Sequence, residues 1–359
     1  MVEVGIQMKS LYENSDYVAD VQMVAELNLP WEKLCNKALM LTGAIGQIGS
    51  FLVDVILYRN VHFGMNCTIY AIGRNEGKAR NRFGEHFGKI SFIEHDINVP
   101  LERKDIGKVD YILHLASNTH PIAYANDPIG TITTNIFGTV NLLDFAVEHG
   151  TERCAFASSN EVYGENRGDV EKFDESYCGY IDCNTMRAGY PESKRCGEAL
   201  CQAYIKQKGL DIVIPRLTRT YGPTLLPTDS KALSQFIHKA IAGENIVLKS
   251  GGTQFYSYTY VADAVSGLLT VLFLGNKGEA YNVADEASDI RLKDLAEIVA
   301  GVVGKKVLFD LPDETEQAGY SKATKARLDN QKLISLGWKS LFPIHVGVER
   351  TIKVLKTIK

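Results

Sequence analysis

The first residues that could do chemistry are a tyrosine and a lysine four positions apart, in the stretch 190–194 (YPESK). Pro191 suits the first turn of a helix, which would place Tyr190 and Lys194 on one face with Cβ atoms roughly 5–6 Å apart. A tyrosine phenol has a pKa of about 10, but nearby positive charges favour the phenolate. We predict that Tyr190 exchanges a proton with a substrate hydroxyl and that Lys194 lowers its pKa. The alternative is a solvated helix face.

A serine-rich segment, 157–164 (ASSNEVYG), precedes this pair. Ser159 is placed to hydrogen-bond the same substrate hydroxyl and to share its proton. The alternative is that Ser159 caps a helix or turn, as serine often does. Asn135, in the segment 134–139 (TNIFGT), is expected to support the site from the preceding helix.

A glycine-rich segment, 42–49 (TGAIGQIG), lies between an apolar run and a helical pattern. Gly43 permits a tight turn, Gly46 lets the backbone approach a pyrophosphate, and Gly49 lets the helix pack on the strand. The helix start then offers N–H donors and a positive dipole end to the phosphates. The segment predicts dinucleotide binding, with the remaining contacts from Ile45, Gln47 and Ile48. The alternative is that the glycines only turn the chain.

Arg74 bears on the choice of dinucleotide. At the end of the second strand an NAD enzyme usually places an acidic residue on the ribose 2′-hydroxyl, but this chain has the sequence GRN at 73–75. A guanidinium group there would pair with the 2′-phosphate of NADP. Alternatively, Arg74 stacks on adenine or is solvated. The local chemistry therefore favours NADP.

Short apolar runs alternate with helical patterns and would position these residues. Strands are expected at 37–42, 67–72, 90–94, 110–115, 153–158 and 210–215, and helices at 48–57 and 130–149. This alternation predicts an α/β fold, a Rossmann-type doubly wound parallel sheet with a smaller C-terminal substrate-binding domain. We expect a helical extension at 1–35, a nucleotide-binding domain at 36–220 with a later return near 256–275, and a substrate-binding domain at 221–359.

The composition excludes several classes of protein. The 359 residues are 45% hydrophobic and 23% charged, with a net charge of −4, so a broad basic surface for nucleic acid is not expected. The longest near-apolar run, 264–274, is far shorter than the roughly 20 residues that span a bilayer. The seven cysteines form no CxxC pair, which argues against a metal site or disulfide framework. We expect a cytoplasmic protein without a membrane segment.

The glycine spacing together with Ser159, Tyr190 and Lys194 resembles the extended short-chain dehydrogenases/reductases, and within them the NAD-dependent epimerase/dehydratase family. The resemblance runs from about residue 37 to the C-terminal helix. It implies bound NAD and a nucleotide-linked sugar as substrate. It also implies that Asp96 and Ile97 meet the adenine, although an aspartate there could equally cap a loop. Further cofactor contacts would come from Leu115, Ala116, Ser117 and Asn135.

The segments 116–121 (ASNTHP) and 159–164 look most like those of UDP-glucuronate decarboxylases and 4,6-dehydratases. Such enzymes oxidise C4 of the sugar, act on the 4-keto intermediate and return the hydride. The resemblance implies that Glu161 is a second base near C5, the alternative being a glutamate that orients its neighbours. The implied substrate contacts are Ser117, His120, Tyr124, Ser159, Asn160, Arg219 and Tyr256.

Three departures from the family pattern matter. Asn160 replaces the aspartic acid that expels the C6 hydroxyl in dehydratases, and an amide cannot act as that acid. Tyr256 replaces an arginine that binds the diphosphate and helps the sugar site of decarboxylases. Arg219 replaces an asparagine before the segment 221–223 (YGP). We hypothesise that Arg219 supplies the charge that Tyr256 cannot.

The sequence therefore favours a redox-neutral change at C4, most simply C4 epimerisation, which needs only Ser159, Tyr190, Lys194 and the cofactor. The alternatives are decarboxylation of a nucleotide-linked uronic acid, 4,6-dehydration, an NADP-dependent carbonyl reductase, or a cofactor-sensing protein without catalysis. The resemblance also implies a homodimer through the long helices near 130–149 and 190–207.

Overall fold

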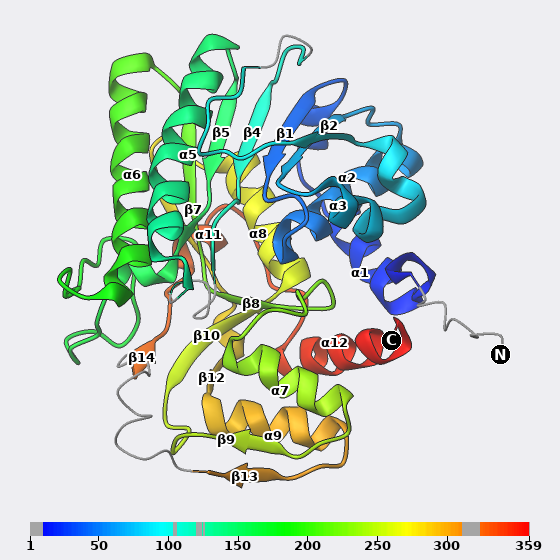
Figure 1. Cartoon of the computed structure of the whole chain (residues 1–359), viewed down its shortest axis with the longest axis vertical. Coiled ribbons are helices and arrows are strands. Elements are labelled where there is room, and N and C mark those ends of the chain that lie inside the picture. The colour runs from blue at the N-terminus through cyan, green and yellow to red at the C-terminus, as the bar shows by residue number, and fades with distance from the viewer. Residues whose placement is uncertain (1–9, 103–105, 120–123, 125, 311–323, 359) are drawn as a thin grey trace.

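A parallel β-sheet forms the centre of the larger lobe of the protein (Figure 1). The computed structural model describes residues 10–102, 106–119, 124, 126–310 and 324–358. The sheet has the order β3-β2-β1-β4-β5-β7-β11, with the short β6 paired to β7. Its strands are β3 (Ser91–Glu94), β2 (Thr68–Gly73), β1 (Ala38–Thr42), β4 (Tyr111–His114), β5 (Arg153–Phe156), β7 (Ile212–Leu217), β11 (Ala280–Val283) and β6 (Ser158–Ser159).

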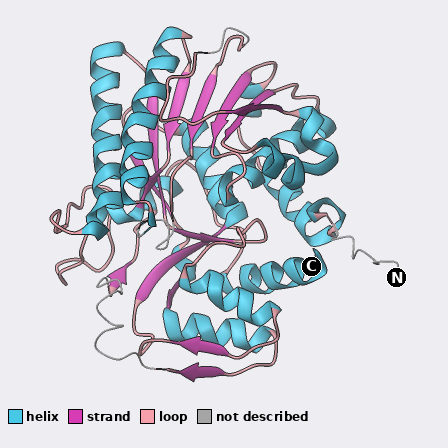
Figure 2. Cartoon of the chain, viewed as in Figure 1, coloured by secondary structure: helices cyan, strands magenta, loops and turns pink. Residues whose placement is uncertain are grey.

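Helices cover both faces of this sheet (Figure 2). On one face lie α5 (Pro128–Glu148) and α6 (Gly189–Lys208), and on the other α2 (Gln47–Phe63) and α8 (Val261–Leu274). Within β1, Leu39 and Leu41 pack into the second of these layers and Met40 into the first, as the period of a strand requires. Because both faces are buried, β1 is an uninterrupted apolar run. The predicted Rossmann-type fold is confirmed.

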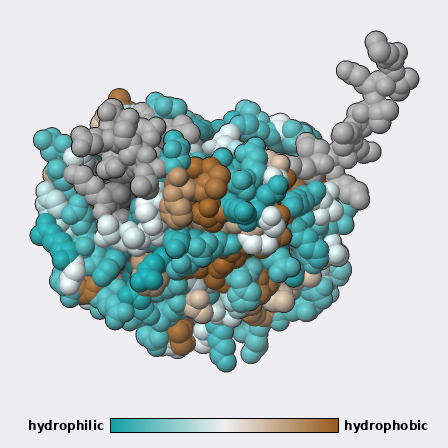
Figure 3. Space-filling model, turned by 90° about the horizontal axis from the view of Figure 1, so that it is seen from below, coloured by the Kyte–Doolittle hydropathy of each residue, from teal (hydrophilic) through white to brown (hydrophobic). Residues whose placement is uncertain are grey.

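The smaller lobe holds helices and short strands below the carboxyl ends of the parallel strands (Figure 1). Its helices are α7 (Ala232–Ile241), α9 (Leu292–Val302) and α12 (Ile344–Ile358). Its strands are β8 (Arg219–Tyr221), β10 (Phe255–Tyr260), β12 (Asp289–Arg291), β14 (Lys325–Ala326), β9 (Ile246–Leu248) and β13 (Val307–Phe309). Seen from below, apolar side chains interrupt a mostly hydrophilic surface (Figure 3), and Leu308 and Phe309 of β13 are exposed.

The remaining elements are short or lie at the edges of the two lobes. They are α1 (Ser15–Ala25), α3 (Glu76–Phe83), α11 (Gln331–Ile334) and the 3-10 turns η1 (Leu11–Glu13), η2 (Trp31–Leu34), η3 (Gly84–Lys89), η4 (Asn160–Tyr163), η5 (Met186–Ala188) and η6 (Glu286–Ser288). Asn14 caps α1 by accepting from the backbone of Asp16 and Tyr17. No helix in the described part of the chain is long and apolar enough to cross a membrane.

The chain returns to the large sheet later than the sequence suggests. Helix α8 lies within the expected return near 256–275 and packs against the sheet, but β11 at 280–283 also joins it, parallel to β7. No strand is expected from the sequence at 280–283. Asn282, in the middle of β11, is fully buried. Its Nδ2 donates hydrogen bonds to the backbone carbonyl oxygens of Phe173 and Asp329. A polar residue inside so short a strand weakens the apolar pattern from which a strand is predicted.

Candidate active site

The loop after β1 has the geometry of a phosphate-binding turn. Gly43 has a φ of +70°, and a Cβ atom there would lie 2.9 Å from the backbone nitrogen of Ala116. A Cβ at Gly49 would lie 2.3 Å from the carbonyl oxygen of Gly43. Gly46 is the N-cap of α2 and provides no side-chain cap, so the first N–H groups of the helix remain available to an anion. The buried Nε2 of Gln47 also has no hydrogen-bond partner in the described structure. This loop fits the pyrophosphate of a dinucleotide.

Thr42 joins this loop to the segment after β4. Its hydroxyl oxygen accepts from the backbone nitrogens of Leu115 and Ala116 at 3.2 Å each and contacts Nδ1 of His114 at 2.8 Å. Burial, and then the charge of Lys194, lower the pKa of His114 to about 3. The imidazole is therefore neutral at neutral pH. These bonds fix the backbone of Leu115 and Ala116 against Gly43, so two of the predicted cofactor contacts lie beside the glycine loop and Ser117 follows them in the chain.

The residues predicted to meet the adenosine half lie at the ends of β2 and β3. Arg74 is exposed and has no hydrogen bond or ion pair with any other described residue. Asp96 is also exposed, and its Oδ1 accepts from the backbone nitrogen of Asn98 at 3.0 Å, which is the loop-capping alternative. Ile97 is buried against Gly138 of α5, where a Cβ atom would lie 2.6 Å from the isoleucine side chain. The contacts of Arg74, Asp96 and Ile97 with a cofactor stay predictions.

Lys194 and Tyr190 lie in the first turns of α6 and are both buried. The Lys194 ammonium donates to the carbonyl oxygen of Ala157 at 2.8 Å and lies 4.8 Å from the centre of the Phe156 ring. Burial lowers the pKa of Lys194 to about 8. Burial raises the pKa of Tyr190, and the negative charge of Glu161 raises it further. The phenol is therefore protonated until a positive charge offsets these effects.

Ser159 contacts both Tyr190 and Glu161. Its hydroxyl lies close enough to the Tyr190 phenol to lower the pKa of that phenol. The same oxygen accepts from the backbone nitrogen of Glu161 at 3.2 Å and so caps η4. The two alternatives for Ser159, proton sharing and capping, are therefore compatible. Asn160, which lies between Ser159 and Glu161 in the sequence, is buried.

Arg187 belongs to this cluster, although the sequence analysis does not include it. Its Nη2 donates to Oε1 of Glu161 at 2.9 Å, and its guanidinium lies 4.9 Å from the centre of the Tyr124 ring. The Tyr124 ring in turn stacks on Tyr190 at 4.9 Å. Arg187 also lowers the pKa of Tyr190. Its position three residues before Tyr190, on the turn that leads into α6, is the signal that would have indicated it.

Asn135 of α5 is buried behind the site and connects three elements. Its Nδ2 donates to the hydroxyl of Ser193 on α6 at 2.9 Å, and its Oδ1 accepts from the hydroxyl of Ser117 at 2.8 Å. The expected supporting position of Asn135 thus has a geometric basis. His120, predicted to contact substrate, lies outside the described residues.

Arg219 and Tyr256 lie on paired strands of the smaller lobe, with Arg219 of β8 opposite Tyr258 of β10. The Arg219 guanidinium carbon lies 3.7 Å from the centre of the Tyr256 ring. The buried Nη1 of Arg219 has no hydrogen-bond partner among the described residues. Burial raises the pKa of Tyr256, the charge of Arg219 lowers it, and the charge of Glu161 raises it slightly, so Glu161 lies within electrostatic range of this pair. Arg219 therefore places a guanidinium group next to Tyr256, the position at which the family pattern has an arginine.

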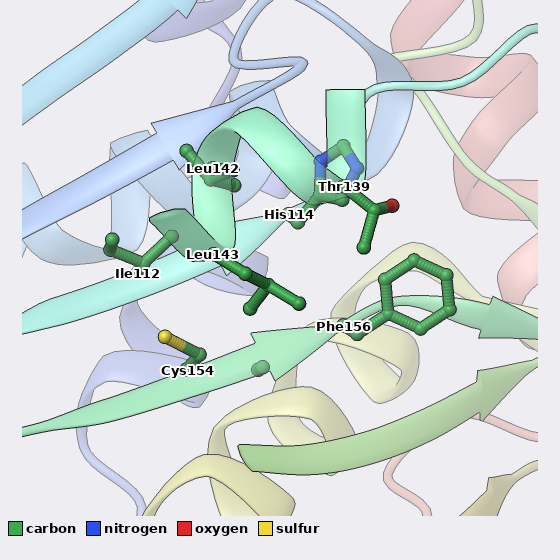
Figure 4. Close-up of a pocket in the computed structure, with 8 residues that line it drawn as sticks. Ile112, His114, Thr139, Leu142, Leu143, Cys154 and Phe156 are labelled. Carbon is green, nitrogen blue, oxygen red and sulfur yellow. The ribbon is translucent and has the colours of Figure 1, made fainter. Parts of the chain in front are cut away.

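A small cavity lies between α5 and the sheet, next to this site (Figure 4). His114 and Thr139 are its polar lining groups, and Nε2 of His114 has no partner in the described part of the chain. Figure 4 shows the imidazole beside Thr139, with apolar side chains from both elements around the rest of the space. The polar cluster at Ser159 and Tyr190, rather than this mainly apolar cavity, is the candidate active site.

Comparisons with known proteins agree with this geometry. The model of the NAD dependent epimerase/dehydratase family matches residues 39–284, which leaves α1 outside the match. UDP-glucuronic acid decarboxylase 1 of Xenopus tropicalis is 32% identical over 88% of this chain and 72% of its own length. UDP-glucuronic acid decarboxylase 3 of Arabidopsis thaliana is 32% identical over 88% and 89%. The solved UDP-glucose 4-epimerase of Thermotoga maritima has a TM-score of 0.75 and 21% identity over 88% of this chain and 98% of its own. The chain belongs to the NAD dependent epimerase/dehydratase family and is an enzyme that uses NAD.

Proposed function

We propose that this enzyme transiently oxidises C4 of a nucleoside-diphosphate sugar and returns the hydride to the opposite face, which is C4 epimerisation. The observation that carries the proposal is the buried cluster of Ser159, Tyr190 and Lys194 at the carboxyl ends of the parallel strands. In open α/β sheets this edge is where ligands bind. The glycine loop that fits a pyrophosphate lies at the same edge.

Each residue of this cluster has a distinct task. The phenolate of Tyr190 accepts the proton of the C4 hydroxyl, and Ser159, which lies beside the phenol, shares that proton. When bound at the glycine loop and the start of α2, NAD would supply the hydride acceptor and donor that this chemistry needs. Arg187 supplies positive charge that opposes the rise in the pKa of Tyr190 caused by burial and Glu161, and we expect the ammonium group of Lys194 to add to it when substrate and cofactor are bound. Lys194 is held for this by the Ala157 carbonyl.

Two features disfavour dehydration. Asn160, buried beside Ser159, has no acidic proton to give to a departing C6 hydroxyl. The carboxylate of Glu161 is engaged in an ion pair with Arg187 at 2.9 Å and so points at the guanidinium. Epimerisation requires neither residue as an acid, so it is the reaction that the cluster supports with the fewest groups.

Decarboxylation of a nucleotide-linked uronic acid is the second candidate. The curated relatives described above carry that activity in their names. Arg187, paired with Glu161, and Arg219, stacked on Tyr256, provide two guanidinium groups, and a uronic acid brings a C6 carboxylate that could pair with either. Loss of carbon dioxide from a 4-keto uronic acid also needs no acid at position 160.

A third candidate, an NADP-dependent carbonyl reductase, is supported by Arg74. Its guanidinium is exposed at the end of β2 and has no partner in the described structure, so it is available to a 2′-phosphate. Such an enzyme would consume NADPH and release the oxidised cofactor. An epimerase or decarboxylase would keep its NAD through purification and turn over without added cofactor.

We also propose a homodimer formed through α5 and α6. These two helices pack along each other on one face of the sheet, and α5 presents Ile129 and Phe137, which are 74% and 55% exposed. Exposed apolar side chains on a long helix are typical of an interface between subunits. We further propose that residues 36–220 form the nucleotide-binding domain, with the later return near 256–275, and that residues 221–359 mainly form the sugar-binding domain.

One experiment tests these candidates together. The purified enzyme is incubated with UDP-, dTDP-, CDP- and GDP-linked sugars, including UDP-glucuronic acid, and the products are analysed by mass spectrometry and NMR. An unchanged mass with inverted C4 supports epimerisation, whereas loss of carbon dioxide, loss of water or addition of two hydrogens supports decarboxylation, dehydration or reduction. The Tyr190→Phe variant is the control, because it keeps the ring and removes the proton-transferring group. If Tyr190→Phe retains full turnover, the catalytic proposal is wrong.

A further inference from the structure

The N-terminal helix α1 contacts both lobes of the molecule. In Figure 1 it lies between α2 and α3 of the larger lobe and α12 of the smaller lobe. Toward the larger lobe, the hydroxyls of Tyr12 and Tyr17 both donate to Asp54 of α2, the former at 2.6 Å. Arg82 of α3 completes this network by donating to Asp54 at 2.5 Å and to the Tyr17 hydroxyl at 2.8 Å. One side of α1 is thus fixed to the helix whose N-terminus faces the glycine loop.

The opposite side of α1 is fixed to the smaller lobe through Asp20, which is fully buried. One carboxylate oxygen accepts from the hydroxyl of Tyr260 on β10 at 2.6 Å, and the other lies 2.5 Å from Nη2 of Arg350 on α12. Arg350 also donates to the backbone carbonyl of Asp16 at 2.9 Å. A buried carboxylate is costly unless it is paired in this way, so these contacts tie α1 firmly to β10 and α12.

The Tyr260 contact leads directly to the candidate substrate site. Tyr260 ends β10 and pairs in register with Tyr221 of β8, the two rings lying 5.6 Å apart. Four residues earlier on β10 is Tyr256, which stacks on Arg219 of β8. The carboxylate of Asp20 therefore holds the end of the strand pair that carries Arg219 and Tyr256, while the rest of α1 is fixed to the cofactor-binding helix.

We infer that α1 is a clamp between the two lobes and that Asp20 is a positioning residue for the substrate site. Through Tyr260, Asp20 sets the place of Arg219 and Tyr256 relative to the glycine loop and Tyr190. The inference rests on the proposed function in one respect, that a nucleotide sugar binds at Arg219 and Tyr256. The clamp itself rests on contacts among described residues.

The experiment compares Tyr260→Phe and Asp20→Asn with Tyr204→Phe. Tyr204 serves as a control because its hydroxyl also donates to an aspartate, Asp144, at 2.6 Å, but at an exposed position within the larger lobe. Tyr260→Phe keeps the ring packing, so the variant should fold even if Asp20→Asn does not. Hydrogen–deuterium exchange is measured on the full-length enzyme over 219–221 and 255–260, together with NAD affinity and steady-state kinetics on the nucleotide sugar that it converts.

We expect amide exchange in β8 and β10 to rise about 5- to 30-fold in both clamp variants, the factor that corresponds to losing one or two kcal/mol. The KM for the nucleotide sugar should rise several-fold with kcat and NAD affinity within about twofold of the wild type, because the clamp acts on position rather than on the reacting groups. Tyr204→Phe should change none of these quantities. Unchanged exchange in β8 and β10, or a loss of kcat with KM unchanged, overturns the inference. If no nucleotide sugar is converted, the proposed function fails, whereas the exchange result still decides whether α1 is a clamp.

Discussion

Replacing Arg219 is the sharpest test of how the substrate's negative charge is held. In the structure the guanidinium carbon lies over the Tyr256 ring, 3.7 Å from its centre, and the buried Nη1 has no hydrogen-bond partner among the described residues. A donor of this kind is available to an anionic oxygen, and a hydrogen bond to a charged group contributes about 1.5–3 kcal/mol. At about 1.4 kcal/mol per tenfold change in affinity, Arg219→Ala should raise the KM for the nucleotide sugar about 10- to 150-fold. NAD affinity should be unaffected, since Arg219 lies on β8 of the smaller lobe.

The assay is steady-state kinetics with the natural sugar nucleotide, supported by calorimetric titration of the corresponding nucleoside diphosphate. Tyr256→Phe is the matched control, because it keeps the aromatic face beneath the guanidinium and removes only the hydroxyl. Arg219→Lys keeps the charge but loses the planar donor, so its KM should lie between those of the wild type and Arg219→Ala. Equal and small effects of Arg219→Ala and Tyr256→Phe would refute the assignment of the charge to Arg219.

Four further predictions concern the cofactor, the catalytic pair and the assembly. Tyr190→Phe should lower kcat by at least about 100-fold while NAD remains bound, measured by turnover and by the absorbance of retained cofactor. Gly49→Ala should abolish NAD binding or folding, since its Cβ would lie 2.3 Å from the Gly43 carbonyl oxygen, and a variant with normal NAD affinity would contradict this reasoning. Burial lowers the pKa of Lys194 from 10.5 to about 8, so the unfolded chain binds more protons between these values and this lysine's contribution to stability rises with pH across them. Urea titrations measure the free energy of unfolding at pH 7.5 and at pH 10.5. Lys194 should contribute up to about 3 kcal/mol to the increase between these pH values in the wild type, and Lys194→Met should lack that contribution. Phe137→Asp, which places a charge on the exposed face of α5, should shift the protein to a monomer in analytical ultracentrifugation, and an unchanged dimer would exclude this interface.

The predictable parts of the site are those in which the chemistry is local in the chain. The glycine loop is recognisable because Gly43, Gly46 and Gly49 each answer a steric demand within one turn, and the close contacts at Gly43 and Gly49 bear this out. Tyr190 and Lys194 were predictable for the same reason, as a helix fixes residues four apart on one face. Most strands of the sheet before residue 215 are also predictable, because they are apolar runs between turns, whereas β3 and β6 are not such runs.

The parts that were missed depend on contacts between distant segments. Strand β11 is defined by its pairing with β7, some 65 residues earlier, and no local pattern marks it. Arg187 gains its place only when η4 brings Glu161 opposite the start of α6. The bond between Asp20 and Tyr260 joins residues 240 positions apart, and sequence periodicity carries no information at that range.

Net charge is a poor guide to what this site binds, because its cations are local and already partnered. Arg187 is paired with Glu161, Arg219 is stacked on Tyr256, and Lys194 donates to the Ala157 carbonyl. None of the three creates a basic surface, which is consistent with a chain of net charge −4. At Arg219 and Lys194 an anionic ligand has to displace only uncharged partners, an aromatic ring and a backbone carbonyl. At Arg187 it has to compete with the carboxylate of Glu161. The affinity for a phosphate or carboxylate group should therefore depend mainly on Arg219, and Arg187 should instead control how closely Glu161 approaches the sugar.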